Sequence, residues 1–199
     1  MPEIKKRSGP KSDSGPEGRG QIMKWNIDPT HSHIQFSVRH MGLSTVRGTF
    51  GELSGAISDD HGSVQSADAD VDMKSINTNS AMRDEHLRGA EFFDVANYPT
   101  AHFRLTKAER KGGDLTVTGD LSIRGVTKPV TLKGEINGPA KDPWGNTKVS
   151  ASIEGKISRQ EWGLVWNQTL ETGGLLVSDE VKLSIDVQAA AAVPQTVAA

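Results

Sequence analysis

The feature that most constrains this chain is an alternation of apolar and polar residues that recurs throughout residues 24–188. In one segment Ile34, Phe36 and Val38 share one face of an extended chain, and the residues between them are polar. A period of two is typical of β-strands that bury one face. The same pattern returns at residues 46–50, 67–73, 101–105, 115–123, 130–136, 149–157 and 181–187. The sequence therefore predicts about eight strands.

Turn signals separate these strands at short intervals. Residues 59–62, 111–114 and 125–129 are rich in Gly, Asp and Pro, which favour tight turns. The alternation changes phase near Gly51, which predicts a bulge there. About eight antiparallel strands can close on themselves and remove their exposed edges. We therefore predict an all-β fold, an extended, roughly eight-stranded antiparallel barrel with one short helix.

That helix is predicted at residues 80–88, the one stretch with helical character in an otherwise β-patterned chain. Thr78, Asn79 or Ser80 can cap its amides, and Gly89 is placed to end it. The pair Phe92 and Phe93 follows directly, so a helix with adjacent aromatic residues is expected to cover one end of the barrel. A covered barrel of this size has room for side chains or one slender apolar ligand.

Small residues interrupt the apolar faces and bear on whether the barrel is hollow. They are Gly48, Ala69, Gly119, Gly134, Ala151 and Gly155. One interpretation is that they leave room inside the barrel. The other is that they relieve crowding between strongly coiled strands.

The two ends of the chain lack the strand pattern. Residues 1–22 have the composition of a disordered tail, residues 23–188 form the predicted barrel, and the Ala-rich residues 189–199 are predicted as a second tail. No apolar run resembles a secretory signal or is long enough to span a bilayer. A cytoplasmic location is the expectation from this pattern.

Composition argues against several classes of function. The formal net charge is −2 and the body of the chain has no basic block, so nucleic acid is not an expected partner. Cysteine is absent, which excludes disulfides and thiolate chemistry. The chain lacks the nucleophile elbow, the P-loop and the dinucleotide fingerprint. We expect no catalytic residues and no cofactor.

The best candidate for a metal site is His31 with His33. On a strand, this spacing places both imidazoles on one face, where zinc or iron could bind, with His40 or His102 as a third ligand. The alternative is that these imidazoles hydrogen-bond to the backbone at the barrel rim.

A second polar group lies on the predicted helix. Arg83, His86 and Arg88 could hold an anionic head group such as a phosphate. The alternative is a solvated helix face on which Asp84 and Arg88 form an i, i+4 ion pair.

Three blocks of sequence resemble the YceI-like family over roughly residues 23–188. They are Asp28-Pro-Thr-His31-Ser32 with Ile34, Phe36, Val38, His40 and Val46-x-Gly48-x-Phe50; then Arg83-Asp84-x-His86-Leu87 with Phe92-Phe93-Asp94-Val95 and Tyr98-Pro99; then Gly119-Asp-Leu with Ile123 and Gly125-Val-Thr-Lys-Pro129-Val130. The resemblance implies a lipocalin-like barrel that binds polyisoprenoid lipids, including isoprenyl pyrophosphates and isoprenoid quinones, in an internal tunnel. Many members carry a secretory signal and are periplasmic; this sequence shows no such signal, so a periplasmic role is not carried over from the resemblance.

From these observations we predict a carrier or sequestering protein for a long isoprenoid lipid. The predicted tunnel residues are Phe36, Val38, Met41, Leu43, Phe50, Met73, Met82, Leu87, Phe92, Phe93, Phe103 and Leu105, with Arg83, His86 and Arg88 at the head group. A metal-assisted enzyme using His31 and His33, and an interaction module without a ligand, stay open as alternatives, as does a homodimer. The inward face of each strand is also open, because a one-residue slip reverses every assignment.

Overall fold

The computed structural model describes residues 22–171 and 173–192, and nearly all of its regular structure is β. The strands are β1 Ile22–Ile27, β2 His33–His40, β3 Ser44–Phe50, β4 Leu53–Asp60, β5 Ser63–Asp72, β6 Ile76–Asn77, β7 Thr100–Lys111, β8 Asp114–Ile123, β9 Val126–Lys141, β10 Thr147–Ser158 and β11 Val177–Ala191. The helices are α1 Ala81–Arg88 and the short 3₁₀ turns η1 Met73–Ser75 and η2 Arg159–Trp162.

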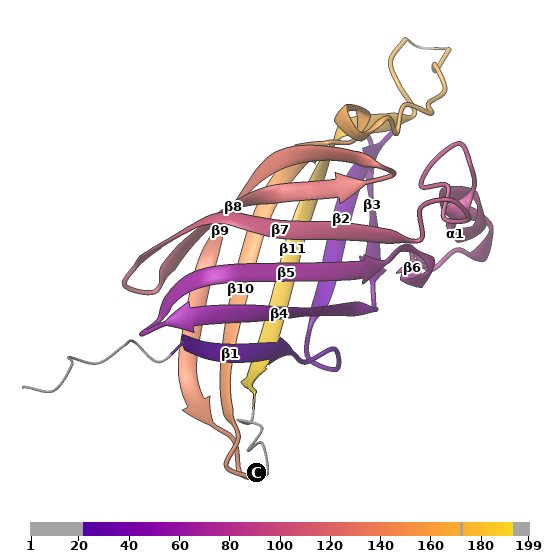
Figure 1. Cartoon of the computed structure of the whole chain (residues 1–199). Helices are drawn as coiled ribbons and strands as arrows, with labels where there is room; N and C mark the ends of the chain where they lie inside the picture. Colours follow the sequence, from indigo (N-terminus) through magenta and orange to yellow (C-terminus); the bar gives the residue numbers. More distant parts are fainter. Residues whose placement is uncertain (1–21, 172, 193–199) are drawn as a thin grey trace, which may run out of the picture.

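Eight of these strands close into an antiparallel barrel in the order β1-β4-β5-β7-β8-β9-β10-β11 (Figure 1). Pairing between β1 and β11, with Trp25 opposite Ala191 and Ile27 opposite Ala189, completes the ring. Closure leaves no free edge among the eight strands. The predicted eight-stranded barrel with one short helix is therefore confirmed.

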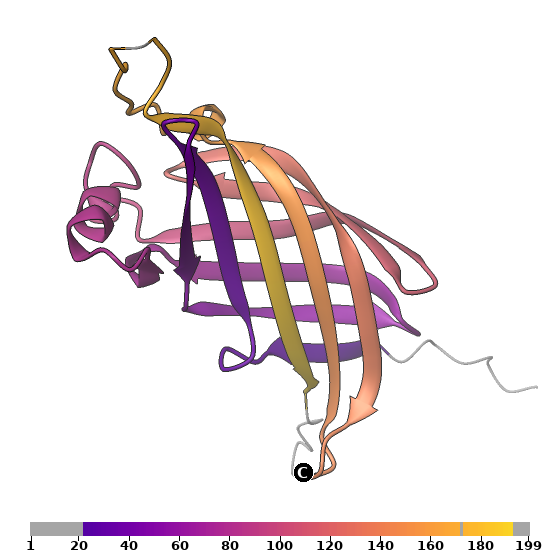
Figure 2. The same cartoon turned by 180° about the vertical axis from the view of Figure 1, so that it is seen from behind.

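The remaining strands extend the barrel wall beyond the closed ring, because β11 pairs with two strands in succession. Its last residues pair with β1, and its residues 181–186 pair with β2. Since β2 pairs with β3 and β1 pairs with β4, residues 22–60 form one long hairpin whose two arms bend, at residues 28–32 and at 51–52 (Figure 2). The phase change near Gly51 is this bend between β3 and β4.

Two of the predicted turns have the expected geometry of two-residue hairpin loops. His61 and Gly62 both have positive φ, 51° and 83°, as the tight turn between β4 and β5 requires. Arg124 and Gly125 do the same between β8 and β9, with φ of 50° and 74°. The second turn is shorter than predicted, since β9 already begins at Val126.

The predicted helix forms, although its ends are held differently from the expectation. Ser80 occupies the N-cap position without a side-chain hydrogen bond to the helix. Instead, the buried Asp84 carboxylate accepts hydrogen bonds from the Thr78 amide at 2.8 Å and the Thr78 hydroxyl at 2.5 Å. These bonds reach back from the helix to the segment before it and fix α1 against that segment. Gly89 ends the helix in an extended conformation.

The predicted boundaries of the tails are wrong by a few residues at each side. Ile22 belongs to β1, and Ala189–Ala191 belong to β11, where Ala189 is only 1% exposed. The Ala-rich sequence resembles a tail, but small side chains are what fit where β1 closes against β11. The rest of both predicted tails, residues 1–21 and 193–199, lies outside the described residues.

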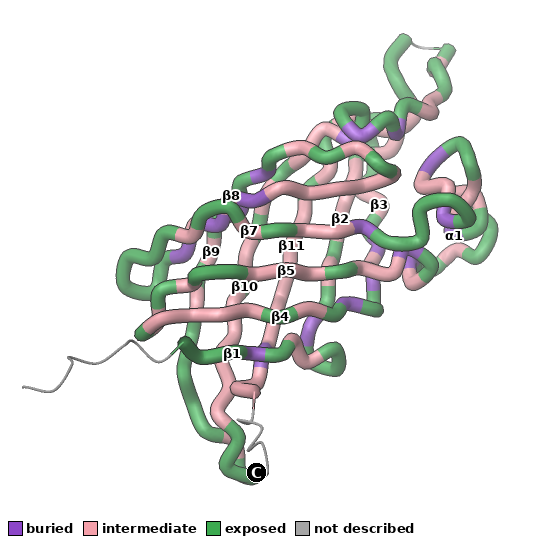
Figure 3. The backbone as a smooth tube through the Cα atoms, in the orientation of Figure 1, coloured by how far each residue is buried: buried purple, intermediate pink, exposed green. Residues whose placement is uncertain are grey.

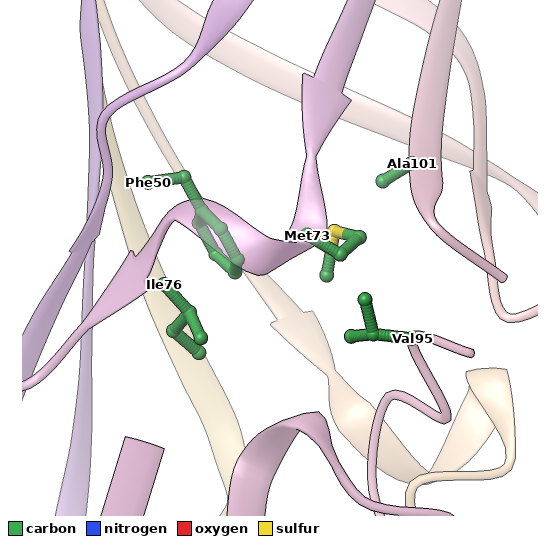
Figure 4. Close-up of a cluster of buried hydrophobic side chains, with 5 residues drawn as sticks. All are labelled: Phe50, Met73, Ile76, Val95 and Ala101. Atoms are coloured by element: carbon green, nitrogen blue, oxygen red, sulfur yellow. The ribbon is translucent and has the colours of Figure 1, made fainter. Parts of the chain in front are cut away.

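The closely packed core lies at the end of the barrel next to α1. Phe50, Met73, Ile76, Val95 and Ala101 are buried there and point toward one another (Figure 4). A neighbouring cluster joins Val130, Trp162 and Leu164. Along the barrel wall, in contrast, many inward residues keep intermediate exposure (Figure 3), as Ile34 and Val38 do. Apolar side chains that point inward and are still partly accessible indicate a hollow interior.

Candidate functional site

A cavity of about 900 Å³ occupies the barrel interior. The apolar faces predicted from the alternation line it on β2, β3, β5 and β7–β11. Apolar residues of β1 and β4, which were not among the eight predicted strands, line it as well. The structure therefore decides what the sequence left open: the apolar face of each strand points inward. Ligand cavities in proteins commonly span about 300–1,000 Å³, so this one is large.

Most of the predicted tunnel residues line this cavity. They are Phe36, Val38, Phe50, Met73, Leu87, Phe92, Phe93, Phe103 and Leu105. Phe50 joins two of the others, with its ring 5.5 Å from that of Phe36 and 5.9 Å, edge to face, from that of Phe93. The aromatic pair after the helix is thus part of the cavity wall, as predicted.

Three predicted tunnel residues lie elsewhere: Met41, Leu43 and Met82 are exposed and do not line the cavity. Met41 and Leu43 fall in the turn between β2 and β3, beyond the end of the alternating face. Met82 lies five residues before Leu87, which places the two about 140° apart around a helix, and Leu87 takes the inward side. These three assignments are corrected.

Among the small residues on the apolar faces, some relieve crowding between neighbouring side chains and others leave room inside the barrel. A Cβ on Gly48 would lie 2.4 Å from Phe36 Cζ, and one on Gly119 would lie 2.3 Å from Phe103 Cζ. At these two positions glycine makes space for a ring that lies across it. Ala69 and Ala151, in contrast, line the cavity and leave it wide.

Two of the three predicted head-group residues reach the cavity at the α1 end. Arg83 donates from Nε to Thr78 Oγ1 and from Nη2 to the Thr78 carbonyl, both at 2.7 Å. His86 packs edge to face on Phe92 and Trp166, and its Nε2 lies 3.0 Å from Glu91 Oε2. Both residues line the cavity.

Arg88 does not line the cavity, so its head-group assignment is corrected. Its guanidinium donates to the backbone carbonyls of Lys74, at 3.0 Å, and Ile76, at 2.8 Å, and so fastens α1 to the segment before it. The alternative i, i+4 ion pair with Asp84 does not form either, because Asp84 is bonded to Thr78.

Comparison with known proteins places this architecture in a family. The YceI-like domain model matches residues 25–189. The chain belongs to the YceI-like family. Protein YceI of Salmonella arizonae and of Salmonella heidelberg are each 38% identical over 175 residues, which cover 86% of this chain and 88% of theirs.

Solved structures of the same fold support the assignment. The YCEI protein of Campylobacter jejuni is 28% identical, with a TM-score of 0.66 over 94% of this chain and 98% of that chain. Two more distant structures share the fold. Burkholderia cenocepacia BcnA has a TM-score of 0.67 at 22% identity, covering 81% of this chain and 98% of its own. A polyisoprenoid-binding domain from Saccharophagus degradans has 0.65 at 18%, covering 84% and 98%.

The histidines proposed as metal ligands do not converge in this YceI-like barrel. His31 precedes β2, so the two side chains do not share a strand face, and each meets a different carboxylate. His33 Nε2 lies 3.4 Å from Asp186. Across residues 22–171 and 173–192, no three His, Cys, Asp or Glu side chains group closely enough to hold a metal ion.

His31 instead helps to fix the bend between β1 and β2. Its Nδ1 lies 2.9 Å from Asp28 Oδ2, and the Thr30 amide and Lys148 Nζ also donate to Asp28, at 3.0 and 3.3 Å. The hydrogen bond to His31 is the main reason that the pKa of Asp28 falls to about 2, with desolvation opposing it and the other two donors assisting. The Asp28 carboxylate therefore links the bend to β10.

Several cavity residues of this YceI-like chain could not be found from alternation. Arg159 and Trp166 lie in the long segment between β10 and β11. Buried Arg159 donates to the carbonyls of Ser178, at 3.0 Å, Trp166, at 2.9 Å, and Leu164, which holds that segment over the cavity. Burial lowers the pKa of Arg159, and nearby Asp179 opposes the shift.

The opposite end of the cavity also has charged lining residues. Asp59 and Arg110 lie on inward faces near the ends of β4 and β7. The bulge between Leu105 and Lys107 shifts the alternation of β7, which is why the sequence does not reveal Arg110 as inward-facing. The Asp59 Oδ1 atom is buried and has no hydrogen-bond partner among the described residues.

Proposed function

We propose that this YceI-like protein binds one long isoprenoid lipid, with the tail in the barrel cavity and the polar head at the α1 end. The observation that carries the proposal is the cavity of about 900 Å³, whose wall is the apolar face of the barrel strands. The Saccharophagus degradans domain of the same fold is described as polyisoprenoid-binding, so isoprenoids are the lipids to test first.

The cavity volume sets the length of the tail. At about 30 Å³ for each group the size of a water molecule or a methylene, the cavity accepts about thirty carbon atoms, or about six isoprene units. At about 0.8 kcal/mol for each methylene removed from water, burying them contributes about 24 kcal/mol. Ordering the chain and immobilising the ligand offset part of this. Even half of the sum corresponds to about nanomolar affinity.

Arg83 and His86 favour a polar head at the α1 end. Two nitrogens of Arg83 are bonded to Thr78, which orients the guanidinium and leaves Nη1 without an acceptor among the described residues. A guanidinium held in this way can donate to a phosphate or to a quinone carbonyl, and more strongly to the charged group. His86 offers an imidazole packed edge to face against Phe92 and Trp166, whose rings also contact each other.

The tail assignment is tested by asking what the purified protein carries. Native mass spectrometry of freshly purified full-length chain, followed by organic extraction, should reveal a bound isoprenoid of about thirty carbons. A protein that stays free of lipid after incubation with isoprenoid alcohols, pyrophosphates and quinones would contradict the proposal.

The head-group assignment has a matched pair of variants. Arg83→Met should weaken an isoprenyl pyrophosphate by about tenfold or more relative to the alcohol of the same length, because a charge-assisted hydrogen bond contributes about 1.5–3 kcal/mol. Arg88→Met removes the same charge from the same helix outside the cavity, and should leave the ratio of the two affinities unchanged. Equal ratios for both variants would remove Arg83 from the head-group site.

A further inference from the structure

Large apolar side chains are exposed around the α1 end of the barrel. They are Met41, Leu43, Met82, Val165 and Leu175, which we call the rim. They come from the β2–β3 turn, from α1 and from the segment between η2 and β11, and these three segments lie toward the same end of the barrel in both views (Figures 1 and 2). Leu43 is 79% exposed and Met82 is 86% exposed. Several large apolar side chains exposed at one end of a fold are candidates for an interaction site.

The rim residues lie next to cavity-lining residues in the chain. Four of its members are chain neighbours of cavity-lining residues: Met41 follows His40, Met82 precedes Arg83, Val165 follows Leu164, and Leu175 precedes Leu176. In each pair, one side chain points into the cavity and the next points out to solvent. Arg83 lines the cavity and is itself exposed, so the cavity reaches the surface within this border.

Hydrogen bonds hold part of the rim in its exposed position. Arg39 Nη2 donates to the carbonyls of Gly42, at 2.6 Å, and Leu43, at 3.2 Å, and its Nη1 donates to Thr45 Oγ1. The Met41 amide donates to the Leu176 carbonyl at 2.8 Å, which ties the β2–β3 turn to the neighbouring segment. The exposed side chains of this turn are thus fixed beside the cavity mouth.

We propose that the rim docks the protein on the surface of a lipid bilayer. This proposal rests on the proposed function, since its purpose is to let an isoprenoid pass between membrane and cavity without crossing water. Apolar tips on separate segments suit a fluid bilayer, which can deform around each tip, better than a rigid protein partner that requires one continuous face.

The charges near the rim indicate which membrane it fits. The rim segments and their neighbours carry both signs: Arg83, Glu85 and Arg88 lie on α1, and Glu161 and Glu171 lie in η2 and the segment after it. Arg39 donates to the β2–β3 turn. No excess of positive charge selects anionic lipid. Insertion of apolar side chains should therefore dominate, and binding to neutral phosphatidylcholine should persist when salt is raised.

The test is flotation of the full chain with phosphatidylcholine vesicles. Leu43→Asp and Val165→Asp should each lower the vesicle partition coefficient by about tenfold or more, the loss expected when one large apolar side chain no longer enters the membrane. The matched control is Trp144→Asp, because Trp144 is 83% exposed in the turn between β9 and β10 at the other end of the barrel, and its neighbours do not line the cavity. The control should bind vesicles as the unchanged protein does.

A second measurement separates this proposal from the proposed function. All four proteins should bind a detergent-dispersed C30 isoprenoid alcohol with the same affinity, because the substituted side chains lie outside the cavity. Suppose that all four proteins bind the alcohol equally. The rim proposal is then wrong, and the cavity proposal stands, in either of two cases: the unchanged protein fails to float with vesicles, or the rim variants float as well as the control. If none binds the alcohol, the proposed function itself fails.

Sedimentation in the absence of vesicles tests whether the rim instead binds a second copy of this chain. A stable dimer that Leu43→Asp dissociates and Trp144→Asp preserves would assign the rim to a second copy of this chain and overturn the membrane proposal. A monomer in all four cases agrees with it.

Discussion

Replacing Ala151 with tryptophan should block the cavity without weakening the fold. Ala151 lies within β10, between Ile136 of β9 and Val187 of β11, and all three line the cavity. Its small side chain leaves space that an indole would fill. The substitution therefore adds bulk where a ligand tail is proposed to lie, and removes no hydrogen bond of the barrel.

The size of the effect follows from the cavity volume. The indole would displace roughly six methylene-sized groups from a cavity that accepts about thirty. A thirty-carbon tail then loses about 5 kcal/mol of burial, which is between three and four orders of magnitude in affinity. A ten-carbon isoprenoid fits in the space that remains and should bind with nearly unchanged affinity. The free energy of unfolding should change by less than about 1 kcal/mol, because the new ring fills empty apolar space.

Calorimetric titration with C30 and C10 isoprenoid alcohols, together with urea unfolding, measures both effects. Glu154→Trp provides the control, since Glu154 is exposed on the outer face of the same strand and the substitution should leave both affinities unchanged. If Ala151→Trp instead lowers the free energy of unfolding by about 1–3 kcal/mol or more, the interior is already filled by side chains and the argument for a hollow barrel is refuted. Equal losses for both alcohols would refute the argument from tail length.

Three further predictions concern stability. Asp28→Asn should lower the free energy of unfolding by about 1 kcal/mol at pH 7. The unchanged protein should lose this stabilisation as the pH falls from 3.8 toward the folded-state pKa of about 2. If urea unfolding shows that the variant loses as much stability over this pH range, the stabilisation does not come from Asp28. Gly119→Ala should cost about 1–3 kcal/mol, because its Cβ would lie 2.3 Å from Phe103 Cζ and 2.5 Å from the Arg104 carbonyl oxygen. An unchanged urea midpoint would show that both the ring and the backbone of β7 shift without cost. Trp162→Phe should lower the free energy of unfolding by about 1–2 kcal/mol, because the 3.0 Å hydrogen bond from Trp162 Nε1 to the Leu121 carbonyl is lost. An unchanged thermal unfolding midpoint would show that this hydrogen bond does not stabilise the fold.

The accuracy of the sequence-based site prediction depended on where each residue stands relative to a strand. Phe36 and Phe103 lie within alternating runs, and both line the cavity as predicted. Met41 and Leu43 lie one to three residues past such a run, where the chain turns and alternation no longer defines a face. Outside regular structure, an apolar residue carries no directional information, so its hydrophobicity alone suggested the wrong side.

Arg159 and Arg88 show the same limit for charged residues. The guanidinium of Arg88 has the chemistry to bind an anionic head group, but it donates its hydrogen bonds to two backbone carbonyls. The sequence does not reveal Arg159 as a cavity residue. Its position in the cavity wall depends on hydrogen bonds to carbonyls that lie five to nineteen residues further along the chain. Whether a cation is free to bind a ligand depends on its neighbours in space.

The sequence by itself determined most of the strands and their apolar faces, the single helix and most of the tight turns, because these follow from local periodicity and turn chemistry. It did not predict β1 or β4, which complete the closed ring. Only the tertiary structure decided that these faces point inward around a cavity, and that β11 pairs first with β2 and then with β1 so that the wall closes and also extends. Strand register and cavity volume arise from contacts between residues far apart in the chain. Such contacts leave no period in the sequence.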